Sequence, residues 1–219
     1  MQMCIGTSLA IIVPTTVRSY YAHKRRGVVL EDIVRLWAAP AVIGVVLGSL
    51  IAAYAPSALF KIVFVVFALT IAFRMIVADA SRSARQRLPG RIALLGYGAL
   101  TGLVASLVGI SGGSVSNAVL THYGRTMQQA VATSAGVGVP ITIAGTIGYA
   151  IAGWRHMAML PPLSVGFVSI VGFALMAPVS SYTASYGVRL AHWLPRRKLE
   201  MAFAGFLLIV SARFVASLL

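Results

Sequence analysis

Acidic residues are almost missing from this chain: Asp and Glu together number four among 219 residues. They are Glu31, Asp32, Asp79 and Glu200, and each lies in a polar connection or at the end of an apolar run. Enzymatic acid–base chemistry needs a carboxylate pair, or a nucleophile with a neighbouring base. The apolar segments offer neither, so the sequence predicts a protein that is not an enzyme and that has no acidic proton relay within a membrane.

Cysteine is scarcer still, and histidine is scattered. The single cysteine, Cys4, excludes an intramolecular disulfide and a cysteine-based metal cluster. The histidines stand far apart at segment ends, without the spacing that assembles a zinc site; they are His23, His122, His156 and His192. We therefore predict no metal and no other cofactor.

Charged residues make up 10% of the chain and apolar residues 59%. A soluble domain carries about a quarter charged residues, whereas a run of about 20 apolar residues spans a bilayer as a helix. The sequence predicts an all-α polytopic membrane protein without a cleavable signal peptide. Seven spans are expected, at 3–22, 32–54, 57–78, 91–121, 128–151, 166–187 and 200–218. The fourth is too long and too rich in glycine for one regular helix.

Basic residues outnumber acidic ones by 18 to four, which gives a net charge of +14. They gather in short connections and form no basic face interleaved with aromatic residues, so no nucleic-acid partner is expected. Anionic lipid headgroups and an anionic substrate remain as explanations. If each of the seven spans crosses the membrane once, residues 24–26, residues 82–91 and Arg155 lie on the same side of the membrane. Arg125 and residues 196–198 then lie on the opposite side. The positive-inside rule assigns the first side to the cytoplasm.

The chain contains an internal repeat. Residues 27–75 match residues 166–214 at a constant offset of 139, and the identities fall at positions that set backbone geometry. They include Gly27 with Gly166, Gly48 with Gly187, Pro56 with Pro195, Phe64 with Phe203 and Arg74 with Arg213. Upstream, Thr7-Ser8 and Pro14 recur at an offset of 126 as Thr133-Ser134 and Pro140, so thirteen additional residues lie in the second copy, around Gly153 to Ser164.

We therefore expect one transmembrane domain, 1–219, built from two repeats: residues 1–78 with three helices and residues 90–219 with four. Four segments in each complete copy would make the repeats parallel, and carriers commonly place the substrate site where repeats meet. The first copy lacks a counterpart of the glycine-rich segment that opens the second. This predicts either a longer reading frame upstream of Met1 or a shortened variant.

Small residues interrupt the apolar sequence at Gly109-Ile110-Ser111-Gly112-Gly113-Ser114. Irregular backbone at membrane depth must be buried in protein or line a cavity, because lipid cannot satisfy its polar groups. A half-helix that starts there would direct free amides and its positive dipole end at an anion, and Ser111, Ser114 and Ser116 would add hydroxyl donors. The alternative is that these residues only allow close helix packing.

The repeated pairs Thr7-Ser8 and Thr133-Ser134 are a second candidate binding element, because hydroxyls near a helix start can donate to an oxyanion. They can instead bond to the preceding turn of their own helix and help it bend at Pro14 or Pro140. Asn117 is expected to pair across helices or to contact substrate.

Three arginines are candidates for a gate or an anion-attracting vestibule: Arg18, Arg74 and Arg213. Long cationic side chains at span ends also extend to lipid headgroups. Both roles stay open on the sequence.

The order of these motifs resembles the sulfite exporter TauE/SafE family of membrane proteins along nearly the whole chain. The matching segments are Gly6–Leu9, His23–Val28, Gly44 with Gly48, Gly109–Gly113, Ala132–Ala135, Leu160–Pro162, Ser164 with Gly166–Val168, and Gly187–Pro195. The family pattern has glycine at the position of Ser111, proline at that of Ala118, and a further glycine-rich helix ahead of the first repeat.

The resemblance implies export or uptake of a small sulfur-containing anion, such as sulfite or an organosulfonate, across the bacterial inner (cytoplasmic) membrane. The expected partners are this anion and the lipid bilayer. Without acidic residues at mid-depth, either a proton travels with a protonatable substrate or the anion follows its own gradient and the membrane potential. The alternative is a membrane scaffold that does not transport, or a half-carrier that works only as a homo-oligomer.

Overall fold

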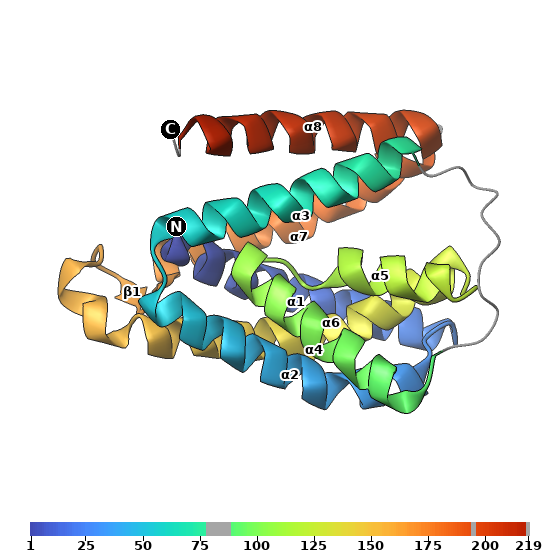
Figure 1. Ribbon diagram of the computed structural model, residues 1–219, viewed down its shortest axis with the longest axis horizontal. Coiled ribbons are helices and arrows are strands. Elements are labelled where there is room, and N and C mark those ends of the chain that lie inside the picture. The colour runs from blue at the N-terminus through green and yellow to red at the C-terminus, as the bar shows by residue number, and fades with distance from the viewer. Residues whose placement is uncertain (78–88, 194–195, 218–219) are drawn as a thin grey trace. The chain divides into compact units, whose positions relative to one another are not determined.

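The computed structural model describes residues 1–77, 89–193 and 196–217, and the side chains in these ranges except those of 74–77, 184–193, 196–200 and 203. The chain is an all-α polytopic membrane protein (Figure 1). Its helices are α1 (Gln2–Arg25), α2 (Glu31–Tyr54), α3 (Ser57–Val77), α4 (Arg91–Val108), α5 (Gly113–His122), α6 (Met127–Ala152), η1 (Trp154–Met159), α7 (Ile170–Trp193) and α8 (Arg196–Ala216). A short hairpin of β1 (Ser164–Val165) and β2 (Val168–Ser169) precedes α7.

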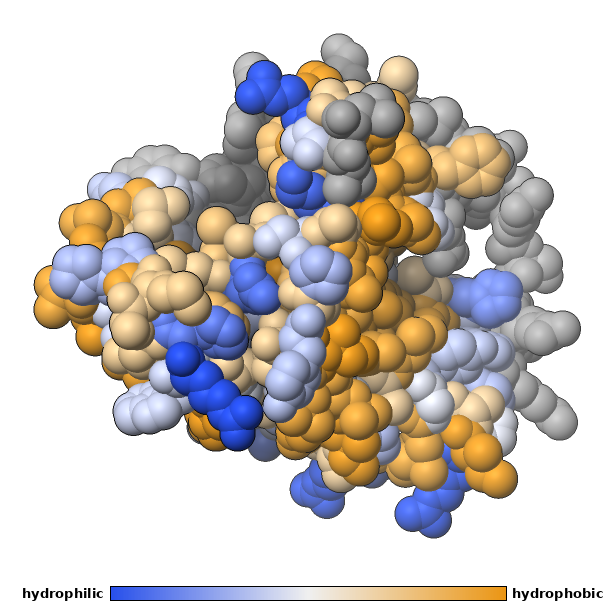
Figure 2. Space-filling view, turned by 60° about the vertical axis from the view of Figure 1, so that its left-hand side comes forward, coloured by the Kyte–Doolittle hydropathy of each residue, from blue (hydrophilic) through white to orange (hydrophobic). Residues whose placement is uncertain are grey.

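Among the described residues, α2, α4 and α6 are long and apolar enough to cross a membrane, and three further helices contain shorter apolar stretches. Large apolar side chains such as Ile43, Leu50 and Ile147 point outward with more than half of their surface exposed. Figure 2 shows apolar side chains spread over much of the face that it draws. A hydrocarbon environment solvates such a surface, whereas water would not.

The expected span 91–121 is two helices joined by a turn. α4 ends at Gly109 with φ 81°, and α5 begins after Gly112 with φ 77°. Both glycines adopt the left-handed backbone that other residues rarely tolerate. Tyr97, near the start of α4, and Tyr123, just beyond α5, bring their hydroxyl oxygens to 3.3 Å. The break predicted from the glycines is confirmed, and the two helices form a hairpin whose ends lie together.

α2 and α4 lie in close contact through small residues. A Cβ atom at Gly102 would collide with the carbonyl of Ala41, and one at Gly44 with the carbonyl of Ala99. Along the whole pair the contacts run from Trp37 with Gly98, through Ala41 with Gly102, to Gly48 with Ser106, so residue numbers rise together and the two helices run in the same direction. The backbones approach through glycines spaced four residues apart, as in many membrane helix pairs.

α1 and α6 run in opposite directions. Along α1 the contacts are Leu9 with Gly145, Thr16 with Thr142, and Tyr20 with Gly136, so the numbers rise on one helix and fall on the other. The expectation of parallel repeats required these corresponding helices to run the same way, and for this pair it is wrong. The physical reason is the α4–α5 hairpin. The chain returns at this hairpin to the side from which α4 started, instead of crossing the membrane, so the number of crossings before α6 differs by one from the expected number.

The chain divides into two compact units, Met1–Tyr54 with Ala84–Pro178 and Ala55–Ser83 with Val179–Leu219. Within the second unit, α3 and α8 also pack in opposite directions. Lys61, near the start of α3, donates from Nζ to the carbonyl of Ser217, just beyond α8, at 3.1 Å. The rings of Phe64 and Phe214 lie 5.0 Å apart. Each unit, taken by itself, thus contains one antiparallel pair of helices that the sequence repeat relates.

The connection between α6 and α7 holds η1 and the β hairpin, at the place where the repeat comparison puts the additional residues of the second copy. α7 therefore begins at Ile170, four residues after the expected start of its span at 166. The corresponding connection between α1 and α2 is short.

Candidate functional site

The N-terminus of α5 carries free backbone donors. Its first intrahelical bond runs from the Ser116 N–H to the Gly112 carbonyl at 3.0 Å, so Gly113, Ser114 and Val115 have amides without an acceptor in their own helix. No side chain caps this end. The helix dipole adds roughly half a positive charge there, which favours an anion.

There is room for a methyl group in front of Gly113. A methyl group built on Gly113 would lie 3.8 Å from Ser111 Oγ and 3.8 Å from Ser134 Oγ, and no other atom outside its own helix would be as near. The space is thus lined by the α5 amides and by hydroxyls from the turn and from α6. These groups are neutral hydrogen-bond donors and acceptors.

The turn runs from Gly109, which lies against Ile5 near the start of α1, to Ser111, which lies beside Gly138 at the middle of α6. The Ser111 Cβ atom would be 3.3 Å from a methyl group on Gly138, and the same methyl group would be 3.5 Å from Thr16 Cγ2. Thr16 contacts Thr142 at the centre of both helices. Half-helices that begin at mid-depth are where transporters bind anionic groups.

Two polar side chains of α5 have a buried atom without a hydrogen-bond partner. Ser116 is 1% exposed, and its hydroxyl has none; the side-chain oxygen of half-buried Asn117 also has none. A buried polar atom left unpaired costs free energy, and bound water or ligand is one way in which such an atom is satisfied. Ser114 is exposed.

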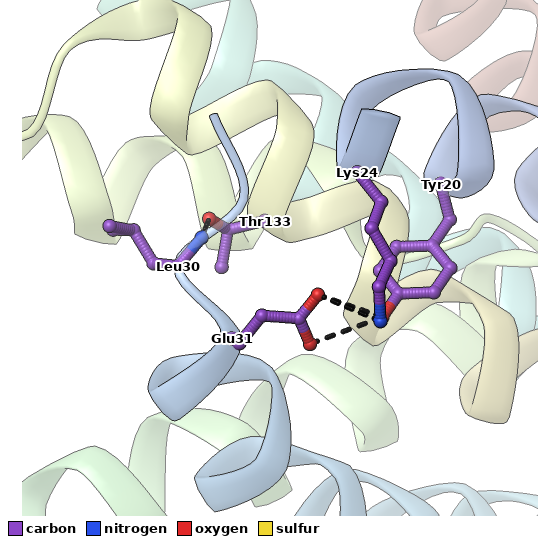
Figure 3. A network of polar contacts seen from close by, with 5 residues as sticks. All are labelled: Tyr20, Lys24, Leu30, Glu31 and Thr133. Atoms are coloured by element: carbon purple, nitrogen blue, oxygen red, sulfur yellow. Dashed lines mark hydrogen bonds and ion pairs between the residues drawn. The ribbon is translucent and has the colours of Figure 1, made fainter. Parts of the chain in front are cut away.

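The threonines of the two repeated pairs are occupied by backbone groups. Thr133 Oγ1 accepts a hydrogen bond from the Leu30 N–H at 3.1 Å, and Thr7 Oγ1 accepts one from the Ser169 N–H at 3.0 Å (Figure 3 for Thr133). Ser134 lies at the open space but donates to the Val131 carbonyl at 2.9 Å. Ser8 is half-buried on α1.

The remaining predicted residues are two prolines and three arginines. Pro14 and Pro140 lie inside α1 and α6, which continue as helices through them. Arg18 and Arg213 are exposed. The side chain of Arg74 lies outside the described residues.

One end of the α1–α6 pair carries most of the described basic connections. A pocket of about 300 Å³ there is lined by His23 and Arg26 from the end of α1 and by Gln128 from the start of α6. Arg125, two residues before α6, therefore lies at the end of the molecule that carries residues 24–26, and Arg155, beyond the end of α6, lies at the other. The assignment of these two arginines by counting crossings is wrong for the reason given above, namely the hairpin.

An ion pair stands at the same basic end. Lys24 Nζ lies 3.2 Å from Glu31 Oε1, and the Tyr20 hydroxyl lies 3.2 Å from each Glu31 oxygen (Figure 3). The hydrogen bond to Glu31 raises the pKa of Lys24 above its ordinary value. The pair is partly exposed, and such pairs add little stability on their own.

Antiparallel apolar helices with a glycine-rich break and an uncapped half-helix between them are typical of membrane transporters. The chain belongs to the sulfite exporter TauE/SafE family, whose model matches residues 1–214. It is 25% identical over 211 residues to a "Probable membrane transporter protein" of Haemophilus influenzae, which covers 96% of this chain and 80% of that protein. It is also 25% identical over 215 residues to a protein of Methanocaldococcus jannaschii with the same description, covering 94% and 76%. No solved structure matches the chain.

Proposed function

We propose that this protein is a multi-pass carrier that exports a small sulfur-containing oxyanion, of the sulfite or organosulfonate class, across the inner membrane. The observation that carries the proposal is the uncapped start of α5 at Gly113, where amides without an acceptor in their own helix face the hydroxyls of Ser111 and Ser134. Preorganised neutral donors hold a small anion without a cation in the apolar interior. No enzymatic step is required.

The residues of the turn take different parts in this proposal. Gly109 and Gly112 give the left-handed backbone that turns α4 into α5, and Gly113 and Ser114 supply amides. Ser111, Ser116 and Ser134 supply hydroxyls, and Asn117 supplies an amide one turn further along α5. Bending at Pro14 and Pro140, and an anion-attracting vestibule that includes Arg18, Arg74 and Arg213, stay part of the proposal.

We further propose that residues 1–78 and 90–219 are repeats of inverted rather than parallel topology. α2 and α7 are both 24 residues long, α3 and α8 are both 21 residues long, and each pair begins 139 residues apart. The opposite directions of α1 and α6, and of α3 and α8, support this arrangement. Inverted repeats commonly meet at the substrate site near the bilayer midplane.

The direction of transport follows from charge. The end with residues 24–26 and Arg125 would face the cytoplasm under the positive-inside rule. An inside-negative potential then drives a monovalent anion outward with about 2.3 kcal/mol per 100 mV. Export therefore needs no proton relay.

This orientation predicts the outcome of a labelling experiment. In a background with Cys4→Ser, Arg125→Cys should react with a membrane-impermeant maleimide only after the cells are opened, and Arg155→Cys should react on intact spheroplasts. The crossing count from sequence makes the reverse assignment for both residues. Labelling of both from the same face would refute the hairpin as the reason for the topology.

The function is tested by flux in proteoliposomes of purified protein. Radiolabelled sulfite should exchange against internal sulfite, unlabelled organosulfonates should compete, and an outward-driving potential should accelerate release. A homo-oligomeric half-carrier would give the same flux, with activity that falls as the protein is diluted into more vesicles. Absence of flux for every anion tried, in vesicles that contain folded protein, would favour the scaffold and contradict the proposal.

A further inference from the structure

Two threonines make the same bond near opposite ends of the α1–α6 pair. Thr7 accepts from the N–H of Ser169, the residue before α7, and Thr133 accepts from the N–H of Leu30, the residue before α2. We call Thr133–Leu30 the basic-side latch, because it adjoins the Lys24–Arg26 connection. We call Thr7–Ser169 the hairpin-side latch, because it adjoins the β hairpin.

The two latches occupy corresponding positions in the internal repeat. Thr133 follows Thr7 by 126 residues, and Ser169 follows Leu30 by 139, which are the two offsets of the internal repeat. Each latch therefore joins α1, or its counterpart α6, to the residue that precedes the next helix of the other repeat, α7 or α2. Such a reciprocal pair arises when two copies are related by an approximate twofold axis.

The axis can be located. Thr16 and Thr142 are themselves separated by 126 residues, and their Oγ1 atoms lie 3.3 Å apart. A residue touches its own counterpart only near a twofold axis, so the axis passes through this contact. It crosses two antiparallel helices, as an inverted repeat requires.

Both latches lie equally far from this axis, and the basic-side latch lies nearer to the candidate anion site, because Ser134 directly follows Thr133. Thr7 precedes Thr16 by nine residues, and Thr133 precedes Thr142 by nine, which is about 13 Å along a helix. Ser111 lies at the level of Thr16. One latch thus stands between the site and each end of the helix pair, and both are closed in this structure.

We propose that Thr7 and Thr133 are positioning residues that close the two ends of the carrier, and that access to the site opens when one latch breaks while the other holds. The inference rests on the proposed function, since it takes the turn at Ser111 as the site between them. A neutral hydrogen bond has a small net strength, so it can break during a transport cycle. The Thr16–Thr142 contact is the pivot about which the two repeats move when one latch closes and the other opens.

The two latches are not equally supported. Beside the basic-side latch, Glu31 pairs with Lys24 and receives the Tyr20 hydroxyl (Figure 3). The counterpart of Glu31 at the offset of 139 is Ile170, which carries no charge. The Glu31 contacts therefore add a small further restraint to the basic-side latch.

The test uses a cysteine reporter at the turn. In a Cys4→Ser background, Ser111→Cys is labelled with an impermeant thiol reagent added to one face of oriented vesicles. Thr7→Val should raise the labelling rate about tenfold from the hairpin side alone, and Thr133→Val should raise it about tenfold from the basic side alone, the ratio that 1.4 kcal/mol produces. Valine keeps the shape of threonine but leaves the partner N–H without its acceptor.

Matched controls separate a latch from a merely structural bond. Thr7→Ser and Thr133→Ser keep the oxygen and should label like the parent, and Glu31→Gln should raise labelling from the basic side only. The latches would be overturned if the labelling rate of folded valine variants rose equally from both faces or did not rise at all. If a valine variant does not fold, the labelling of Glu31→Gln and of the two serine variants decides. The assay needs no substrate, so side-specific labelling together with absent sulfite flux would refute the proposed function and leave the latches standing.

Discussion

Replacing Gly113 with Leu is expected to abolish sulfite flux while the protein still folds in the membrane. The space in front of Gly113 accepts a methyl group, because the nearest atoms outside its own helix, Ser111 Oγ and Ser134 Oγ, would lie 3.8 Å away. A leucine side chain would fill that space and displace both anion and water from the α5 amides. We expect a loss of flux of about a hundredfold, equivalent to about 2.7 kcal/mol.

Smaller changes at the same turn sharpen this prediction. Gly113→Ala should fold normally and lose about tenfold in flux, because one methyl group fills only part of the space. Gly112→Ala should instead impair folding, since φ is 77° and its Cβ atom would lie 2.7 Å from Thr101 Cγ2. Wild-type flux in Gly113→Leu, measured at equal amounts of protein in the vesicles, would remove the turn from the transport path.

Replacing Gly102 with Val should unfold the α2–α4 pair. Any Cβ atom at this position collides with the backbone carbonyl of Ala41, which cannot move aside as a side chain can. Overpacking in an interior costs about 1–3 kcal/mol, and a clash with backbone lies at the upper end of that range. Thermal unfolding in detergent, followed by circular dichroism, should register a large fall in midpoint temperature.

Gly96 supplies the matched control for this change. It lies in the same helix, is exposed, and would meet nothing within 4 Å if a side chain were added. Gly96→Val should therefore change the free energy of unfolding by no more than about 0.5 kcal/mol. Equal destabilisation by the two substitutions would show that valine in α4, rather than contact with α2, is responsible.

The glycine turn was predictable because its signal is local. Consecutive small residues within an apolar run break a membrane helix wherever they occur. The return of the chain at this turn was not predictable, since the same residues suit a helix that continues to the far face. That choice depends on the contact between Tyr97 and Tyr123, on the two sides of the break.

For the internal repeat, too, the sequence predicts which helices correspond but does not predict their relative direction. The offset of 139 relates helices whose first residues also differ by 139, such as Glu31 of α2 and Ile170 of α7. The relative direction of the copies could not be read from identities, because it depends on whether residues 91–121 cross. One misjudged segment therefore reversed the topology and the faces assigned to Arg125 and Arg155.

The sequence predicts that the hydroxyls of Thr7 and Thr133 donate to an anion, and this stays a prediction. The fold adds a second role, because both accept hydrogen bonds from N–H groups 162 and 103 residues away along the chain. A signal was present, since Leu30 and Ser169 correspond at the offset of 139. Only the fold shows that these positions meet the threonines of the opposite copy.

The central claim, that a small oxyanion binds the first turn of α5 at mid-depth, is tested most directly by NMR of isotopically labelled protein titrated with sulfite. We predict saturable shifts of the backbone amides of Gly113, Ser114 and Val115, and their absence in Gly113→Leu. Shifts confined to the basic end, around Arg26 and Gln128, with unchanged α5 amides would contradict the account.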